Sequence, residues 1–118
     1  MIAGCLVSPA MAADLQHGKQ AFAVCAACHE SAEPGLAPPL AGVVGRKAGS
    51  LPGFVYSNPM KRAGFVWDTA RLLDFVQDPQ SVVSGTRMAF SGLDDPRDAA
   101  DLVAYLAQLD GPADLAQK

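Results

Sequence analysis

Apolar residues recur at helical spacing in three stretches of the chain, and the first lies near the N-terminus. Leu15 and Phe22 are seven positions apart and share one helix face, and Asp14 just before them is a suitable N-cap. We therefore expect a helix from residue 15 to about residue 28. Gly18 within this helix costs about 1 kcal/mol relative to alanine, which indicates close packing against another helix.

The second stretch follows Asp68, which can cap a helix through its side-chain oxygen. Proline lacks the backbone N–H that a helix interior needs, so this helix must end or kink by Pro79. The pattern predicts one helix in the middle of the chain. Its apolar positions are Leu72, Leu73, Phe75 and Val76.

The third stretch opens at Asp94 or Asp95, with Pro96 in the first turn, where a missing N–H costs nothing. Gly111-Pro112 is expected to end the helix, since glycine and proline commonly follow a helix C-terminus. An apolar stripe along it predicts burial of one face. That stripe consists of Ala99, Leu102, Val103, Leu106 and Leu109.

Between the first two helices, residues 33–65 show little periodicity. Glycine and proline interrupt this segment repeatedly, which predicts a long loop. A loop of this length is unusual in a compact domain unless it encloses something. The interrupting residues are Pro34, Gly35, Pro38, Pro39, Gly42, Gly45, Gly49, Pro52, Gly53, Pro59 and Gly64.

The 118 residues suffice for one small domain, and a hydrophobic share of 50% indicates a globular chain. The net charge of −3 argues against nucleic-acid binding. This charge is uneven, because residues 1–62 carry +2 and residues 63–118 carry −5. The two halves could present different faces to a partner, or they could form an ordinary solvated surface of mixed charge.

The first residues resemble the end of an export signal. Met1–Ala13 carry no charge, and the small residues Ala10 and Ala12 fit a cleavage site. We expect residues 1–12 to be a signal remnant, residues 13–110 the domain and residues 111–118 a flexible tail. No stretch is long enough to span a membrane.

Cys5 leaves a second possibility open. Ile2-Ala3-Gly4-Cys5 resembles the lipobox of bacterial lipoproteins, in which the cysteine carries a lipid anchor. We favour cleavage near Ala12, and lipidation of Cys5 remains the alternative. Both predict export to the bacterial periplasm, with or without membrane anchoring.

The strongest chemical signal is Cys25-Ala26-Ala27-Cys28-His29, a pattern typical of covalent attachment of a c-type haem. Residues three apart share a helix face, so both sulfurs can reach the two vinyl groups of one porphyrin. His29 can then bind the iron. The long loop has a haem to enclose, and we expect one haem c per chain.

With this motif in place, the order of the remaining motifs resembles that of class I cytochromes c, over about residues 14–110. A lone CxxCH motif can be accidental, but the ordered set is specific. The matching pieces are Gly18 and Phe22; Cys25-Ala26-Ala27-Cys28-His29; Pro38-Pro39-Leu40-Ala41-Gly42; Gly45-Arg46-Lys47-Ala48-Gly49; Pro52-Gly53-Phe54-Val55-Tyr56-Ser57; Trp67; Gly85-Thr86-Arg87-Met88; and Leu102-Val103-Ala104-Tyr105-Leu106.

The resemblance implies an all-α fold in which the first and last helices cross and one middle helix and long loops wrap the haem. It also implies Met88 as the sixth iron ligand, opposite His29. Met60 is the competing thioether, although its surroundings lack the family pattern. A His/Met pair fills both axial positions, which implies one-electron transfer and no catalytic residues.

The resemblance also assigns the surroundings of the haem. The carbonyl of Pro38 is expected to accept the second ring proton of the haem histidine. Arg46, Tyr56 and Trp67, with Ser57 as a weaker candidate, are expected near the propionates. Leu40, Phe90, Leu102 and Leu106 are expected to form apolar walls. Gly18 and Phe22 are expected to pack on Leu102 and Tyr105.

The sequence departs from the mitochondrial pattern where partners dock. Gln80 and Ser81 replace lysines, and Ala23, Val24 and Ala27 leave the haem edge short of positive charge. We therefore expect a partly apolar docking face and a monomer that exchanges electrons with redox-partner proteins. The donor would be of the quinol–cytochrome c reductase type, and the acceptor an oxidase, a reductase or a photosynthetic centre.

Other functions remain in competition with a carrier of the respiratory or photosynthetic chain. A dedicated haem subunit of one periplasmic dehydrogenase or reductase would have nearly the same sequence. A peroxidase or gas sensor would need an open iron position. Zinc binding would need a second ligand pair, and a haem with two histidine ligands would need His17, which is expected to be a solvated helix residue.

Overall fold

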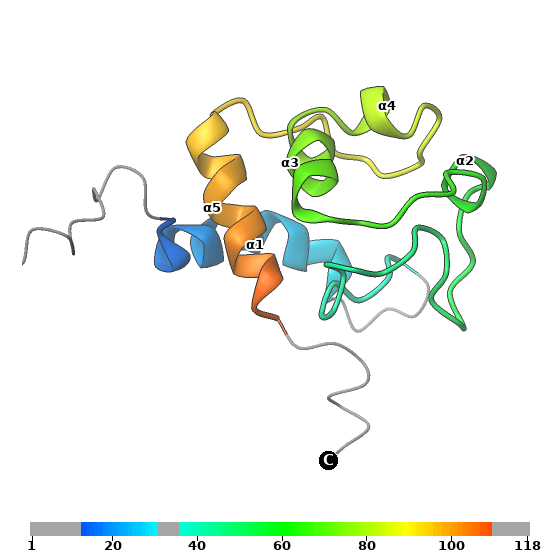
Figure 1. Cartoon of the computed structure of the whole chain (residues 1–118), viewed down its shortest axis with the longest axis horizontal. Coiled ribbons are helices and arrows are strands. Elements are labelled where there is room, and N and C mark those ends of the chain that lie inside the picture. The colour runs from blue at the N-terminus through cyan, green and yellow to red at the C-terminus, as the bar shows by residue number, and fades with distance from the viewer. Residues whose placement is uncertain (1–12, 31–35, 110–118) are drawn as a thin grey trace, which may run out of the picture.

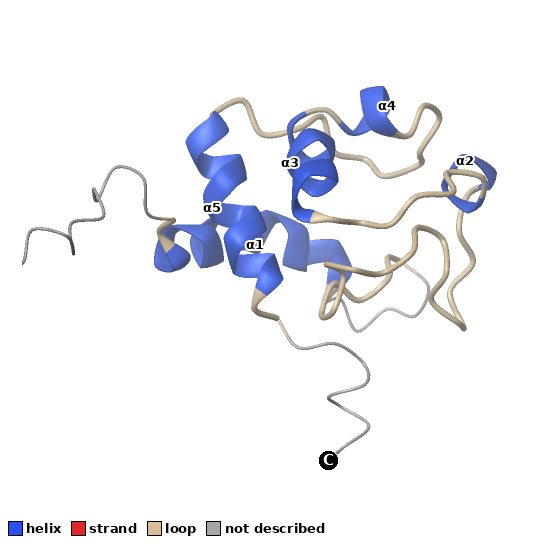
Figure 2. Ribbon diagram, viewed as in Figure 1, coloured by secondary structure: helices blue, strands red, loops and turns tan. Residues whose placement is uncertain are grey.

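The computed structural model of the chain describes residues 13–30 and 36–109. The predictions for Cys5, the signal remnant 1–12 and the tail 111–118 lie outside these residues. The described part is helical, with no strand and a single isolated bridge between Lys47 and Val66. Figures 1 and 2 show the first and last helices at one side and the long loops, with one short helix among them, at the other.

The all-α prediction is confirmed within the described ranges, and the expected middle helix is present at Thr69–Gln77. Two single turns flank the expected helix, and proline in the first turn of each starts them. None of these helices is long and apolar enough to cross a membrane. The helices are α1 (Leu15–His29), α2 (Asn58–Lys61), α3 (Thr69–Gln77), α4 (Pro79–Val82) and α5 (Pro96–Ala107).

The predicted caps are present. The carboxylates of Asp14, Asp68 and Asp95 accept hydrogen bonds from backbone N–H groups in the first turns of α1, α3 and α5. The predicted end of the last helix is wrong, because α5 ends at Ala107. The N–H of Gln108 bonds to the carbonyl of Tyr105, a tighter turn that stops the helix before Gly111.

α1 crosses α5 (Figure 1), and Gly18 lies at their contact. A Cβ on Gly18 would overlap the backbone carbonyl of Asp101 and lie 2.9 Å from Cβ of Tyr105. One turn further along α1, the ring of Phe22 packs on that of Tyr105 with centroids 5.3 Å apart. The predicted helix contact is confirmed, and it explains why the helix tolerates a glycine.

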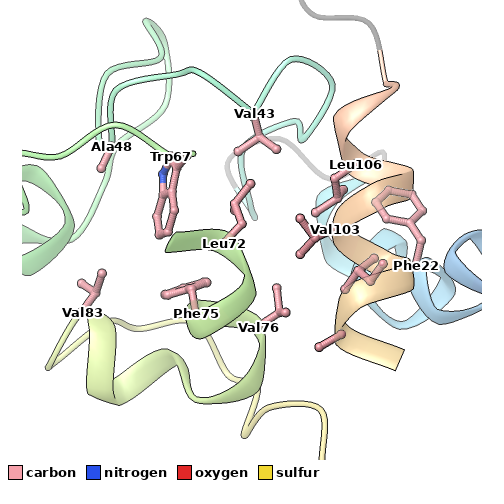
Figure 3. Packing of buried hydrophobic residues seen from close by; sticks show 12 residues of the cluster. Phe22, Val43, Ala48, Trp67, Leu72, Phe75, Val76, Val83, Val103 and Leu106 are labelled. Carbon is pink, nitrogen blue, oxygen red and sulfur yellow. The ribbon is translucent and has the colours of Figure 1, made fainter. Parts of the chain in front are cut away.

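α3 completes the helical core by packing on α5. Figure 3 shows Leu72 and Val76 on the side of α3 that faces Val103 and Leu106 of α5, and Phe75 below Trp67. The Phe75 ring stacks edge-on against Trp67 with centroids 4.9 Å apart. The core therefore joins all three long helices to Trp67, at the end of the long loop region. The buried residues of α3 are Leu72, Phe75 and Val76.

Backbone hydrogen bonds hold the long loop in place. The N–H of Gly45 donates to the carbonyl of Trp67 at 2.7 Å, and the N–H of Trp67 donates to the carbonyl of Arg46 at 2.8 Å. The N–H of Gly42 bonds to the carbonyl of Leu109 beyond α5. The loop is thus tied both to itself and to the C-terminal end of the helical core.

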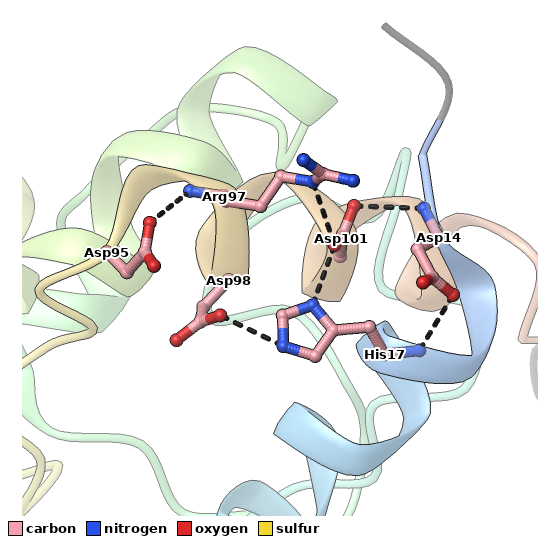
Figure 4. Close-up of polar contacts among 6 residues, drawn as sticks. All are labelled: Asp14, His17, Asp95, Arg97, Asp98 and Asp101. Atoms are coloured by element: carbon pink, nitrogen blue, oxygen red, sulfur yellow. Dashed lines mark hydrogen bonds and ion pairs between the residues drawn. The ribbon is translucent and has the colours of Figure 1, made fainter. Parts of the chain in front are cut away.

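A polar cluster joins the N-terminal end of α1 to α5 beside their crossing (Figure 4). His17 is not simply solvated, as the sequence suggested, because its Nδ1 lies 2.7 Å from Asp101 and its Nε2 3.0 Å from Asp98. Asp101 is 1% exposed. It also accepts the backbone N–H of Asp14 at 3.0 Å, and Arg97 Nε lies 3.4 Å from it.

This cluster shifts the pKa values of His17 and Asp101. The hydrogen bond to Asp101 raises the pKa of His17 above its ordinary 6.5, against the opposing effect of burial, and Asp98 and Asp14 add to the rise. The backbone N–H of Asp14, together with His17 and Arg97, lowers the pKa of Asp101. The ion pair therefore contributes fully below pH 6.5 and is lost as pH rises through the raised pKa of His17. At the acid end it is lost as pH falls through the lowered pKa of Asp101.

We predict that Gly18→Ala destabilises the protein by about 1–3 kcal/mol, because overpacking against a backbone carbonyl outweighs the gain of about 1 kcal/mol in helix propensity. Chemical unfolding of the haem-loaded protein measures the change. Lys19→Ala, at an exposed neighbouring position, is the control and should have little effect. A stabilised Gly18→Ala variant would contradict the close crossing.

We predict that His17→Gln lowers the melting temperature more at pH 6 than at pH 9. The imidazolium that joins Asp98 to Asp101 is present at the lower pH and is lost as its raised pKa is passed. The comparison is made with the parent protein at each pH. Gln20→Ala, exposed on the same helix, controls for the helix itself. An equal effect at both pH values would rule out the ion pair.

Candidate functional site

A cavity of about 550 Å³ lies between the helical core and the loops. Side chains of α1, α3 and α5 line it together with residues of both loop regions, and most of its lining is apolar. All the site residues expected from the sequence line this one cavity: Cys25, Cys28, His29, Pro38, Leu40, Arg46, Tyr56, Ser57, Trp67, Met88 and Phe90.

A second hollow lies on the surface of α3 and α4 and has a different character. It measures about 480 Å³, opens to solvent and is lined by polar residues, including Arg71, Asp74 and Asp78. Among the residues that the structure describes, neither a thiol nor an imidazole reaches it. We therefore place the site at the apolar cavity.

The C-terminal end of α1 brings two sulfurs and an imidazole to the apolar cavity. Cys25 and Cys28 lie three positions apart and both line the cavity. Cys28 is exposed, while Cys25 is half-buried, and this burial raises the pKa of its thiol. The two thiols can therefore bond to one flat group that fills the cavity along one edge.

His29 is held in a defined orientation. Its Nδ1 lies 2.6 Å from the carbonyl oxygen of Pro38, and because a carbonyl only accepts, Nδ1 carries the proton. Burial lowers the pKa of His29, and Arg46 adds to this, although the bond to Pro38 opposes it. The ring is thus neutral at pH 7 and Nε2 keeps the lone pair that a metal needs.

Two thioethers of the described ranges reach the same cavity. Met88 comes from the loop between α4 and α5, and its N–H donates to Thr86 Oγ1 at 3.3 Å. Met60 comes from α2, and its N–H donates to Ser57 Oγ at 3.3 Å. Both sulfurs therefore lie at the same cavity, and substitution of each methionine decides which one is a ligand.

Polar side chains line the cavity among these groups, and several already have backbone partners. Arg46 donates to the carbonyls of Pro39 at 2.9 Å and Ala41 at 2.8 Å, so it fixes the loop that carries the acceptor of His29. Burial lowers the pKa of its guanidinium. The hydroxyl of Tyr56 accepts the N–H of Leu51 at 3.2 Å. Ser57 caps α2, which gives its hydroxyl a structural task.

The sequence missed part of the apolar wall. Leu72, Phe75 and Val76 line the cavity as well as the core, although their helical spacing suggested burial alone. Their apolar spacing was visible in the sequence, but a helix face that contacts a cofactor has the same spacing as a face that packs in the core. Phe54 and Val43 lie in the loop and had no periodic signal.

His17 is at the other end of α1 and does not line the cavity, so the alternative of two histidine ligands is wrong. Within residues 13–30 and 36–109, no three His, Cys, Asp or Glu side chains cluster to hold a metal on their own. A metal bound by one imidazole and one thioether would need a macrocycle to supply its other donors. The two thiols, the neutral imidazole, the thioethers and the apolar volume fit a covalently attached haem.

Comparison with known proteins gives consistent results. A family model described as Cytochrome c matches residues 15–110. Cytochrome c2 of Rhodomicrobium vannielii is 47% identical over 103 residues, which cover 85% of this chain and 82% of that protein.

Two solved structures share the fold. Cytochrome cH from Methylobacterium extorquens has a TM-score of 0.74 and 43% identity, covering 80% of this chain and 97% of that one. Ferricytochrome c2 from Rhodopseudomonas palustris has a TM-score of 0.73 and 34% identity, covering 82% of this chain and 99% of that one.

Proposed function

Because this chain belongs to the cytochrome c family, it is a one-electron carrier with one covalently bound haem c, and we propose which of its residues hold that haem. Cys25 and Cys28 form the thioether links, and His29 and Met88 are the axial ligands. The observation that carries this assignment is the convergence of all four on one apolar cavity.

When bound, the haem supplies an iron that alternates between the ferric and ferrous states. The protein does the rest through its side chains. Pro38 fixes the tautomer of His29, and a thioether ligand favours the reduced iron. The apolar walls exclude water from the site. Arg46, Tyr56 and Trp67 serve the propionates, whose charge is costly to bury without partners.

The carrier is favoured over the alternatives. Two protein ligands leave no open iron position, which disfavours a peroxidase or a gas sensor, and we propose a carrier without catalytic residues. The named relatives are cytochromes c2 and cH, which favours a carrier over a haem subunit dedicated to one enzyme.

We place the carrier in the bacterial periplasm, since the first residues resemble an export signal. There it accepts electrons from a quinol-oxidising complex and passes them to an oxidase, a reductase or a photosynthetic centre. The cavity mouth supports a partly apolar contact. Val24 lines it and is 53% exposed, and of the Asp, Glu, Lys and Arg side chains in the described ranges only Arg46 and Arg87 line the cavity.

We predict that Met88→Leu abolishes the far-red absorption band of methionine-ligated ferric haem and that Met60→Leu leaves it intact. Both changes keep the side chain apolar and similar in volume, so packing is disturbed little. The band is read from absorbance spectra of the oxidised holoproteins. A reduced haemochrome spectrum confirms two thioether links in each variant. Loss of the band in Met60→Leu alone would overturn the ligand assignment.

We predict a shallow salt dependence for electron transfer from a purified bacterial quinol–cytochrome c reductase. A contact with few charges gains little from electrostatic steering, so the bimolecular rate constant should change less than about threefold between low and physiological ionic strength. Stopped-flow kinetics measures it.

Two lysine variants identify the face used. Val24→Lys adds a charge at the cavity mouth and should alter the slope with ionic strength. Val66→Lys adds the same charge at a position that is 49% exposed and does not line the cavity, so its slope should match the parent. A steep slope for the parent protein would contradict the apolar docking face.

A further inference from the structure

We propose that Gln80 is a positioning residue for the methionine ligand. Its carboxamide closes the turn at Gly85–Thr86 and thereby holds Met88 at the cavity. The inference rests on the proposed assignment of Met88 as an axial ligand, and it adds a control on how firmly that ligand is held.

Both ends of the Gln80 carboxamide are engaged. Its Nε2 donates to the carbonyl of Thr86 at 2.9 Å, and its Oε1 accepts the N–H of Gly85 at 2.9 Å. The side chain therefore pairs with the turn as a neighbouring strand would, with one donor and one acceptor. Both bonds are made from α4 to the segment that leads into Met88.

Further hydrogen bonds fix the turn itself. The N–H of Thr86 bonds to the carbonyl of Val83 at 3.0 Å, and the hydroxyl of Ser84 bonds to the carbonyl of Gln80 at 3.0 Å. Thr86 is buried, with 7% of its surface exposed. Its hydroxyl accepts the N–H of Met88. A continuous set of hydrogen bonds thus runs from Gln80 through Thr86 to the ligand residue.

Little regular structure supports Met88 otherwise. Residues 83–95 contain no helix or strand, so side-chain bonds and a few backbone bonds, such as that from the N–H of Leu93 to the carbonyl of Val76 at 2.8 Å, hold this segment. Beyond Thr86, Arg87 donates to the carbonyl of Val55, and its guanidinium lies 5.7 Å from the centre of the Phe54 ring. Arg87 also lines the cavity, whereas Gln80 does not, so Gln80 can be changed without altering the haem contacts.

A neutral thioether is readily displaced unless the protein holds it against the iron. An added ligand such as imidazole binds only when Met88 has left, so its apparent dissociation constant is inversely proportional to the fraction of open protein. Loss of the Gln80 bonds raises that fraction. The affinity for imidazole therefore reports how well the turn is held, separately from overall stability.

The test uses the ferric holoprotein and imidazole titration at pH 7, followed by loss of the far-red methionine band. Gln80→Met removes both hydrogen bonds at similar volume and should lower the apparent dissociation constant about tenfold or more. Gln80→Glu keeps an acceptor for the N–H of Gly85 but cannot donate to Thr86, so an intermediate fall is expected. If one variant does not fold, the other carries the test.

Gln77→Glu is the matched control. Gln77 makes the same kind of bond, from Nε2 to the carbonyl of Leu73 at 3.1 Å, but within α3. It should lower stability without changing the affinity for imidazole. Parent-like affinity in both Gln80 variants, or an equal change in Gln77→Glu, would overturn the positioning role.

The two levels of inference fail differently. If the parent band persists in Met88→Leu, the ligand assignment is wrong and the role of Gln80 falls with it. If the band depends on Met88 but both Gln80 variants bind imidazole as the parent does, the ligand assignment stands and only the role of Gln80 is rejected.

Discussion

The close crossing of α1 and α5 is the constraint on which the rest of the structure depends. Gly18 lets the two backbones touch, and that contact fixes the direction of α1. His29 lies eleven residues further along, about 16 Å at the rise of an α-helix. A small error in the crossing angle would therefore move the sulfurs and the imidazole together. α5 lines the same cavity through Leu102 and Leu106, so one contact sets two walls of the site.

The loops meet a different requirement, because they must enclose a large apolar volume with few helical turns. Backbone bonds between residues 45–48 and 65–67 bring Arg46 and Trp67 to the same cavity. Side chains also bond to loop carbonyls, as Arg46 does to Pro39 and Gln80 does to Thr86. The cavity is bounded by these bonds on one side and by the helical core on the other. The bound haem then acts as the part of the core that the chain does not supply.

Much of this was predictable from the sequence because the signals were local. Helix caps, the apolar spacing of α3 and α5 and the CxxCH motif each depend on neighbouring residues. The features that were missed depend on residues far apart or on single turns. His17 contacts Asp101, which is 84 positions away, and the sequence around either residue does not indicate this contact. α2 and α4 are too short for a periodic pattern, and α5 ends early through a tighter last turn. The roles proposed for the cavity residues in holding the haem stay predictions, because they concern contacts with the bound haem.

The crossing of the first and last helices also dictates when the domain can fold. Asp14 and Asp101 are 87 positions apart, so their hydrogen bond closes almost the whole domain into one loop. During synthesis α1 is made first, and it can pack on α5 only after the whole of α5 has been made. A high share of contacts of such long range slows the folding of a small domain. Cys25 and Cys28 are therefore made before the α1–α5 contact can form, so their thiols can be reached for covalent attachment while the chain is still open.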